Sequence, residues 1–173
     1  MKNLLSLIAA SVLMFSVQSI YAQGQKPSPP DSVSQKINSG ATISINYSKP
    51  GLKGRTMGKD VEPMTGKVWR MGANEATVFT TDKEVKVEGK SLPAGKYSLF
   101  GINNSNGTFT LIFNKKWNIW GTQYEENKGN DVLKVTVPVT KASNSEERLT
   151  YRITPAGKVT MQWGTLVVPF NVK

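Results

Sequence analysis

Residues 41–47, with the sequence ATISINY, decide the fold class of this chain. Apolar and polar side chains alternate strictly along the stretch, from Ala41 to Tyr47. Successive side chains of a β-strand point to opposite faces, so this pattern places all the apolar groups on one face. The stretch is therefore predicted to be a half-buried β-strand.

The same period of two recurs on both sides of this stretch. Alternating segments are predicted at residues 33–37, 76–81, 85–88, 96–102, 108–114, 131–139, 148–154, 159–163 and 165–172. Short turns rich in glycine, asparagine or proline separate many of them, and no segment shows a convincing helical period. The pattern predicts an all-β domain, an antiparallel β-sandwich (or flattened barrel) of about nine or ten strands.

Two long stretches break the alternation. Residues 49–67 contain two prolines and four glycines, and residues 115–130 are polar with two tryptophans. Loops of this length in a compact domain are commonly functional. We therefore expect any site to lie where the loops at 49–75 and 115–130 meet.

The first residues predict an exported protein. Lys2 precedes an apolar run at 4–17, and a small residue, Ala22, closes it, which is typical of a signal peptide at residues 1–22. The run is too short for a membrane span, and no second apolar run is long enough for one. Residues 23–32 are expected to be an extended polar leader, and residues 33–173 a single β-sandwich domain in the periplasm or outside the cell.

The composition excludes several chemistries. The chain contains neither cysteine nor histidine, so the usual zinc sites, Ser-His-Asp triads and Cys-His dyads are impossible. No metal and no cofactor is indicated. An enzyme on this chain would depend on Asp, Glu, Lys, Arg or Tyr.

The chain has a formal net charge of +10, or +9 once Lys2 is removed with the signal peptide. Such a balance attracts polyanions. The lysines are scattered, with Lys115 and Lys116 the only adjacent pair, which is typical of a solvated surface. Together with export, this pattern argues against nucleic acid as a partner.

Four blocks of sequence are similar to those of a known family. They are NYSKPGLKGR at 46–55, GKVWRMGANEAT at 66–77, LPAGKYSLF at 92–100 and the aromatic and amide block at 113–121. The chain resembles, over residues 26–173, a bacterial family known as domain of unknown function 2911. The resemblance implies an exported, mostly β domain and no particular activity.

The first candidate site surrounds Gly72 in the block at 66–77. Its residues could hold a carboxylate, a phosphate or sugar hydroxyls, because guanidinium groups offer a planar fork of donors. The candidates are Lys53, Arg55, Trp69, Arg70, Asn74 and Glu75. The structural alternative is that Arg70 pairs with Glu75 and that Trp69 packs into the core.

The second candidate is the pair Trp117 and Trp120 in a loop rich in amides. Exposed indoles next to amides are suited to stacking on sugar rings. The alternative is that one or both indoles cap the open end of the sandwich.

A third possibility is a pair of carboxylates for glycoside hydrolysis, which must face each other at a defined separation. The candidates are Glu75, Glu125, Glu126 and Asp131, and no spacing identifies a pair. The glycine-rich stretch at 51–60 fails as a phosphate loop, since Asp60 stands where a Ser or Thr is needed.

The sequence thus favours a non-catalytic binding or envelope-associated module for a saccharide or a small anion. A hydrolase that uses a carboxylate pair is one alternative. The other is a protein that joins an envelope assembly through a sheet edge or an apolar patch.

Overall fold

The computed structural model describes residues 27–173. The predicted signal peptide at residues 1–22 lies outside the described residues. The first strand begins at Pro30, so the end of the stretch expected to be a leader belongs to the sheet. A proline fits there because the first residue of an edge strand does not need a backbone donor.

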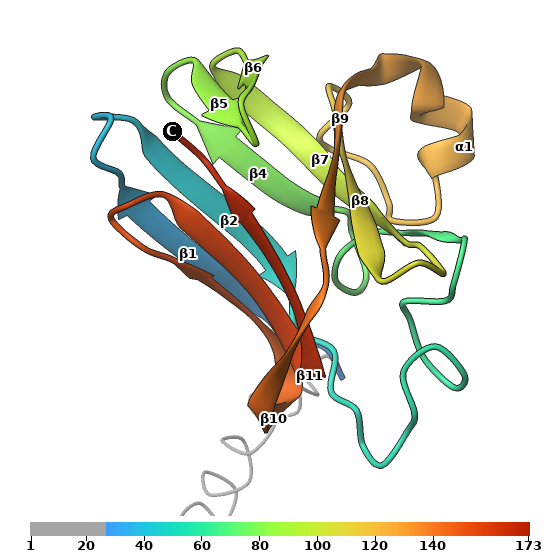
Figure 1. Cartoon of the computed structure of the whole chain (residues 1–173). Helices are drawn as coiled ribbons and strands as arrows, with labels where there is room; N and C mark the ends of the chain where they lie inside the picture. Colours follow the sequence, from blue (N-terminus) through green and yellow to red (C-terminus); the bar gives the residue numbers. More distant parts are fainter. Residues whose placement is uncertain (1–26) are drawn as a thin grey trace, which may run out of the picture.

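A curved antiparallel sheet forms the larger layer (Figure 1). Its strand order is β1-β2-β4-β7-β8-β9, and the two-residue strand β3 pairs with β7 beyond the end of β4. The bounds are β1 (Pro30–Lys36), β2 (Thr42–Ser48), β3 (Val68–Trp69), β4 (Thr77–Thr81), β7 (Gly95–Asn103), β8 (Thr108–Asn114) and β9 (Asp131–Pro138).

A long hairpin forms the opposite layer. It consists of β10 (Thr140–Ile153) and β11 (Lys158–Asn171), and it lies across the open side of the curved sheet. β10 approaches β1 and β11 approaches β9, so the hairpin brings the two layers together at both edges. A small hairpin of β5 (Val85–Val87) and β6 (Lys90–Leu92) extends this layer, because Val87 pairs with Val172. The expected all-β sandwich is confirmed.

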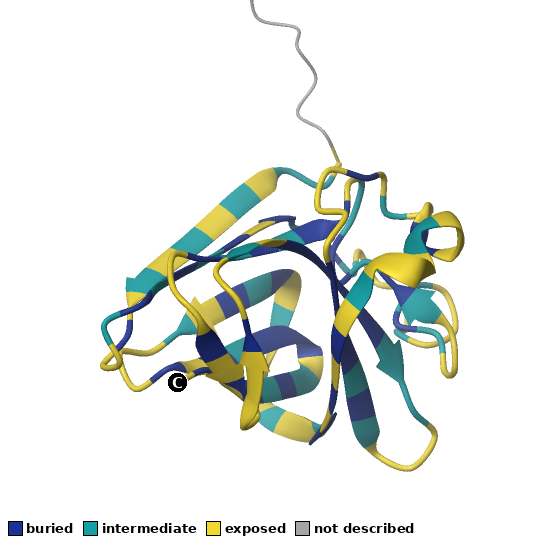
Figure 2. Cartoon of the chain, turned by 90° about the horizontal axis from the view of Figure 1, so that it is seen from above, coloured by how far each residue is buried: buried dark blue, intermediate teal, exposed yellow. Residues whose placement is uncertain are grey.

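The main core lies between the two layers. Ile43, Ile45 and Phe79 on the large sheet are fully buried, as are Met161 and Val168 on the hairpin. The polar positions between them face outward, and Figure 2 shows this alternation of buried and exposed residues along the strands. The pattern that predicted the strands is therefore the pattern that builds the core.

The outer face of the large sheet carries a second, smaller core. Phe100 on β7 and Ile112 on β8 point outward, and Ala76, Ile119 and Tyr124 pack on them. The covering segment contains a one-turn helix α1 (Tyr124–Asn127) and a 3-10 turn (Lys128–Asn130), within the stretch expected to be irregular.

Three details differ from the sequence prediction. The described residues contain eleven strands rather than nine or ten. β10 begins at Thr140 rather than at 148, because bulges opposite β11 remove the alternation from its first half. β11 is one strand, since Gly164 adopts a positive φ of 56° at one of those register shifts instead of ending the pairing. Within residues 27–173, no helix has the length and apolar character needed to cross a membrane.

Candidate functional site

The outer face of β1, β2 and β4 carries a strip of small, mostly polar side chains. The strand register aligns Ser32 with Asn46 and Val78, and it aligns Ser34 with Ser44 and Thr80. These side chains point outward because the residues between them on β2 and β4 are buried in the main core. We call the six residues the polar platform: Ser32, Ser34, Ser44, Asn46, Val78 and Thr80.

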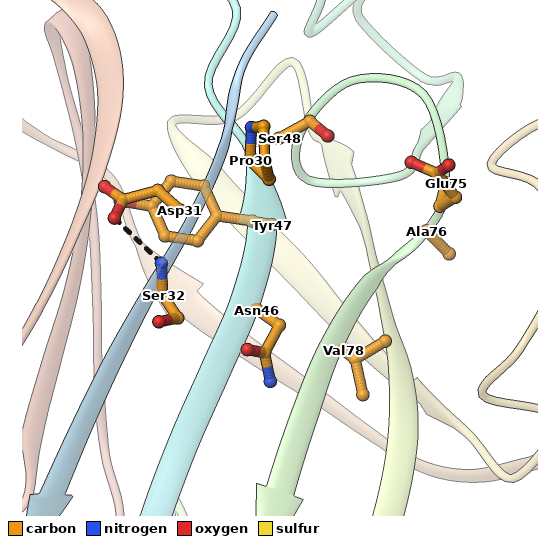
Figure 3. Close-up of a pocket in the computed structure, with 9 residues that line it drawn as sticks. All are labelled: Pro30, Asp31, Ser32, Asn46, Tyr47, Ser48, Glu75, Ala76 and Val78. Carbon is orange, nitrogen blue, oxygen red and sulfur yellow. Dashed lines mark hydrogen bonds between the residues drawn. The ribbon is translucent and has the colours of Figure 1, made fainter.

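A hollow of about 550 Å³ lies at one end of the platform. Its floor includes Ser32, Asn46 and Val78, which lie side by side on three adjacent strands in Figure 3. Glu75 and Ala76 form its rim on the β4 side. The hollow is open and shallow, and its lining is mostly uncharged.

A wall bounds the platform on the side of β4 that faces β7 in the sheet. Residues 116–121 form this wall: the hydroxyl of Ser98 donates to the carbonyl of Lys116 at 2.8 Å, and Ser98 pairs with Val78. Farther along, the backbone N–H of Ala76 donates to the carbonyl of Ile119, and that of Gly121 donates to Asn74. The loops at 49–75 and 115–130 therefore meet beside the hollow.

Both tryptophans of the wall are accessible to solvent. Trp117 is 42% exposed and Trp120 is 47% exposed. The ammonium of Lys96 lies 4.6 Å from the centre of the Trp117 ring, and Lys96 pairs with Thr80 at the end of the platform. Trp120 and Glu75 form an antiparallel bridge without mutual hydrogen bonds, the arrangement in which opposed side chains lie closest. One indole thus stands at the platform's end and the other at the rim of the hollow.

The turn before β4 holds the rim in place. Met71 and Asn74 have positive φ angles of 55° and 60°, whereas Gly72 does not, so the glycine is needed for space rather than for its φ. The carbonyl of Met71 accepts hydrogen bonds from the hydroxyls of Thr77 and Tyr151. These buried bonds fix the unusual backbone that delivers Asn74 and Glu75 to the surface.

Arg70 and Asn74 have structural partners. The guanidinium of Arg70 donates to the carbonyl of Asn74 at 3.0 Å, and its stem lies against Gly121. The amide of Asn74 donates to Ser28 and Ser48. The ion pairs of residues 27–173 do not include Arg70 with Glu75, so that part of the structural alternative is wrong.

The other half of that alternative is right, since Trp69 is a core residue. It is 2% exposed, stacks on Trp163 with 5.9 Å between ring centres, and donates to the carbonyl of Gly72. Lys53 and Arg55 do not line the hollow. The N–H of Lys53 donates to Glu147 on β10, and the Arg55 guanidinium donates to the carbonyls of Gly51 and Leu52. Of the predicted site residues, the structure brings together Arg70, Asn74, Glu75 and Trp120, with Trp117 farther along the same wall.

A family model described as "Protein of unknown function (DUF2911)" matches residues 28–172. The chain belongs to the DUF2911 family. The match includes the whole sandwich, both loops and the platform, and it confirms the resemblance seen in the sequence. No curated protein and no solved structure matches the chain.

The carboxylates of this DUF2911 domain are dispersed. Asp131 accepts hydrogen bonds from Asn114 and Tyr124 and pairs with Lys134, while Glu125 and Glu126 lie exposed on α1. Only Glu75 of the four predicted candidates lines the hollow. The described residues contain no cluster of three or more groups that could hold a metal ion.

Asp31 also borders the hollow, but its carboxylate lies on the inner face of β1, where it accepts a hydrogen bond from Tyr47. Partial burial raises the pKa of this carboxyl, but hydrogen bonds from Lys49, the Ser32 N–H and Tyr47 outweigh it, and the net pKa is lowered. A general acid needs the opposite shift. The Lys49 ammonium lies 2.9 Å from the carboxylate, so the charge of Asp31 is compensated within the fold.

Sequence reasoning missed the platform itself. Its signal was present in the outward positions of residues 41–47, which are Thr42, Ser44 and Asn46 and carry no charge in a chain rich in lysine. The alternation shows that these groups face outward, but the strand register is needed to align them with Ser32 and Thr80.

Proposed function

We propose that this chain is a non-catalytic saccharide-binding module, with its site at the hollow and the adjoining wall. One observation carries the proposal: two half-exposed indoles stand on the wall beside a surface of hydroxyl and amide groups, and one of them, Trp120, bridges to Glu75 at the rim of the hollow. Most tryptophans are buried in the core, so two that stay exposed along one wall are suited to contact a ligand.

The chemistry of the hollow matches a sugar. The C–H faces of a pyranose ring can stack on the indole of Trp120, and its hydroxyls can bond to Ser32, Asn46 and Glu75. A ligand site of this kind combines an apolar surface with a few placed polar groups.

The same residues argue against the small anion considered from the sequence. The guanidiniums of Arg55 and Arg70 are bonded to backbone carbonyls, and the charged side chain at the rim of the hollow is the carboxylate of Glu75. An anion there would face negative charge without an uncommitted arginine fork. A neutral saccharide avoids this repulsion.

We also propose that the module works outside the cytoplasm. The support is the pattern at residues 1–22, a basic residue, an apolar run and a small residue, which is typical of a signal peptide.

Thermal unfolding with a panel of saccharides tests the proposal. A ligand present at 100 times its Kd stabilises the folded state by about 2.7 kcal/mol. For a domain of this size, that corresponds to a rise in Tm of several degrees, at about 2–4 °C per kcal/mol. The Trp120→Ala variant is expected to abolish the rise.

Val132→Ala is the matched control, because Val132 is also a large apolar side chain, 47% exposed, on β9. It should retain the full shift in Tm. If no saccharide shifts the Tm of the folded protein, or if Trp120→Ala keeps the shift, the binding proposal is wrong. A protein partner in an envelope assembly would then be the next function to test.

A further inference from the structure

We infer that the ligand is an extended, uncharged glycan chain that lies across the strands of the platform, rather than a single sugar held in the hollow. This inference rests on the proposed function and deepens it. It adds Ser34, Ser44 and Thr80, which lie beyond the hollow, to the binding surface.

The platform is an uncommitted polar surface. Among residues 27–173, the hydroxyls of Ser34, Ser44 and Thr80 and the amide of Asn46 have no hydrogen-bond partner in the fold. They are exposed or half-buried on regular strands, so their positions are fixed by the sheet. A ligand can therefore use these groups without breaking any bond of the folded protein.

The outer face of the sheet is divided into a covered half and an open half. Over β7 and β8 it is apolar, with Phe100 and Ile112, and the segment with Ile119 and Tyr124 covers it. Over β1, β2 and β4 the same face is polar, and its side chains remain accessible. Trp117 and Trp120 stand on the boundary, where a chain lying on the open half would reach the wall.

Charge identifies the class of occupant. None of the six platform residues is charged, although 20% of the chain is. Lys36 follows Ser34 on the outer face of β1, Lys96 lies beside Trp117, and Glu75 borders the hollow near Trp120, so the charges lie at the margins of the surface. Burying a charged group of a ligand on an uncharged strip would cost its solvation without a partner. The surface is complementary to hydroxyl-rich, uncharged chains.

Geometry favours an extended chain over a single ring. Neighbouring strands lie about 4.8 Å apart, close to the advance per residue of an extended glycan. A chain running along one row meets a hydrogen-bonding group on β1 and on β2 before it reaches β4 and the wall. Val78, at the β4 end of one row, gives the C–H face of a sugar an apolar contact. Each additional ring thus meets the side chain of another strand.

Isothermal titration with neutral oligosaccharides of increasing length tests the inference. The probes are glucan, xylan, mannan and N-acetylglucosamine series, each as mono-, di- and tetrasaccharide. For the series that binds, we expect the tetrasaccharide to bind at least about tenfold more tightly than the monosaccharide. We expect Asn46→Ala to lower the affinity for the tetrasaccharide by about tenfold. The ratio of the tetrasaccharide affinity to the monosaccharide affinity should therefore become smaller.

Asn38→Ala is the matched control. It removes the same amide from an exposed position between β1 and β2, outside the platform, and should bind like the unmodified chain. A second variant, Ser44→Gln, places a larger uncharged side chain across the rows and should weaken the tetrasaccharide more than the monosaccharide. Thermal unfolding of each variant shows whether it is folded.

The outcomes separate this inference from the proposed function. If all lengths bind with equal affinity and Trp120→Ala abolishes binding, the module binds single sugars and the extended-chain inference is wrong. If a charged oligosaccharide of the same length binds better than its neutral counterpart, the inferred ligand class is wrong. If no saccharide of any length binds, both proposals fail.

Discussion

Gly72 shows how one residue sets the geometry of the rim. A Cβ at this position would lie 2.8 Å from the hydroxyl oxygen of Thr77 and 3.2 Å from the carbonyl oxygen of Ser48. The Thr77 hydroxyl cannot turn away without losing its bond to Met71. The turn therefore has no space for a side chain at this buried position.

We predict that Gly72→Ala destabilises the fold by about 1–3 kcal/mol, the usual cost of overpacking a well-packed site. Chemical denaturation measures the change in the free energy of unfolding. Gly129→Ala is the control, because a Cβ there meets no atom within 4 Å, and its effect should stay within about 0.5 kcal/mol. Equal losses in the two variants would contradict the packing argument.

At the scale of elements, the segment at 116–130 is held to the sheet by few side chains. Ile119 is 8% exposed, and the rings of Tyr124 and Phe100 lie 4.9 Å apart. These contacts belong to the small outer core, which is separate from the core between the layers. We therefore expect the segment that carries both exposed tryptophans to open without unfolding the sandwich.

We predict that Ile119→Ala loosens this segment. Removing a buried isoleucine side chain costs about 2–5 kcal/mol, and here most of the cost should fall on the local opening. Hydrogen exchange at residues 116–130 is expected to accelerate, while exchange in β2 and β7 stays unchanged. The affinity for the glycan should fall, because the wall is less ordered. Uniform acceleration across the whole domain would instead show that the segment is part of one cooperative unit.

The sequence predicted those elements whose side chains alternate. β2 alternates throughout, β8 and β9 alternate except at Ile112 and Val132, and the bounds of all three agree with the prediction within one or two residues. The first half of β10 was missed, since its residues 140–147 are almost all polar and its pairing is bulged. The helix α1 has four residues, which is too short for any helical period to show.

The candidate site was predictable only in part, for similar reasons. Two irregular loops with exposed aromatics indicated a surface, but nothing local distinguishes Trp69, which is buried, from Trp120, which is exposed. Each follows an aliphatic residue, Val68 or Ile119, and whether the indole is buried depends on the part of the fold that covers it. The platform was beyond sequence reasoning because cross-strand neighbours such as Asn46 and Val78 are fixed by register alone.

At the scale of the whole molecule, buried tyrosines link the two layers. Burial and the hydrogen bond to Asp31 together raise the pKa of Tyr47 to about 12. Burial also raises the pKa of Tyr151, whose ring meets that of Tyr47 edge to face at 4.7 Å. Both hydroxyls must stay protonated for the layers to pack as they do.

We predict that stability falls at high pH. Because the folded pKa of Tyr47 is raised, its contribution is fully present below the unfolded value of about 10 and is lost as the pH rises through 12. Denaturation midpoints measured across this range, with tyrosinate absorbance as a second signal, check the result. The Tyr47→Phe variant should lose part of this dependence of stability on pH. Ionisation of every tyrosine near pH 10 in a folded protein would contradict it.

The position of β11 at the end of the sandwich also affects when the domain can fold. It is the last strand of the sandwich, and its buried side chains, among them Trp163 and Phe170, complete the main core. A chain made from its first residue onward exposes the inner face of the large sheet until β11 has been synthesised. Folding must wait for contacts that are far apart in sequence, which is intrinsically slow. For a protein that we propose is exported, slow folding would leave more time for translocation of the unfolded chain.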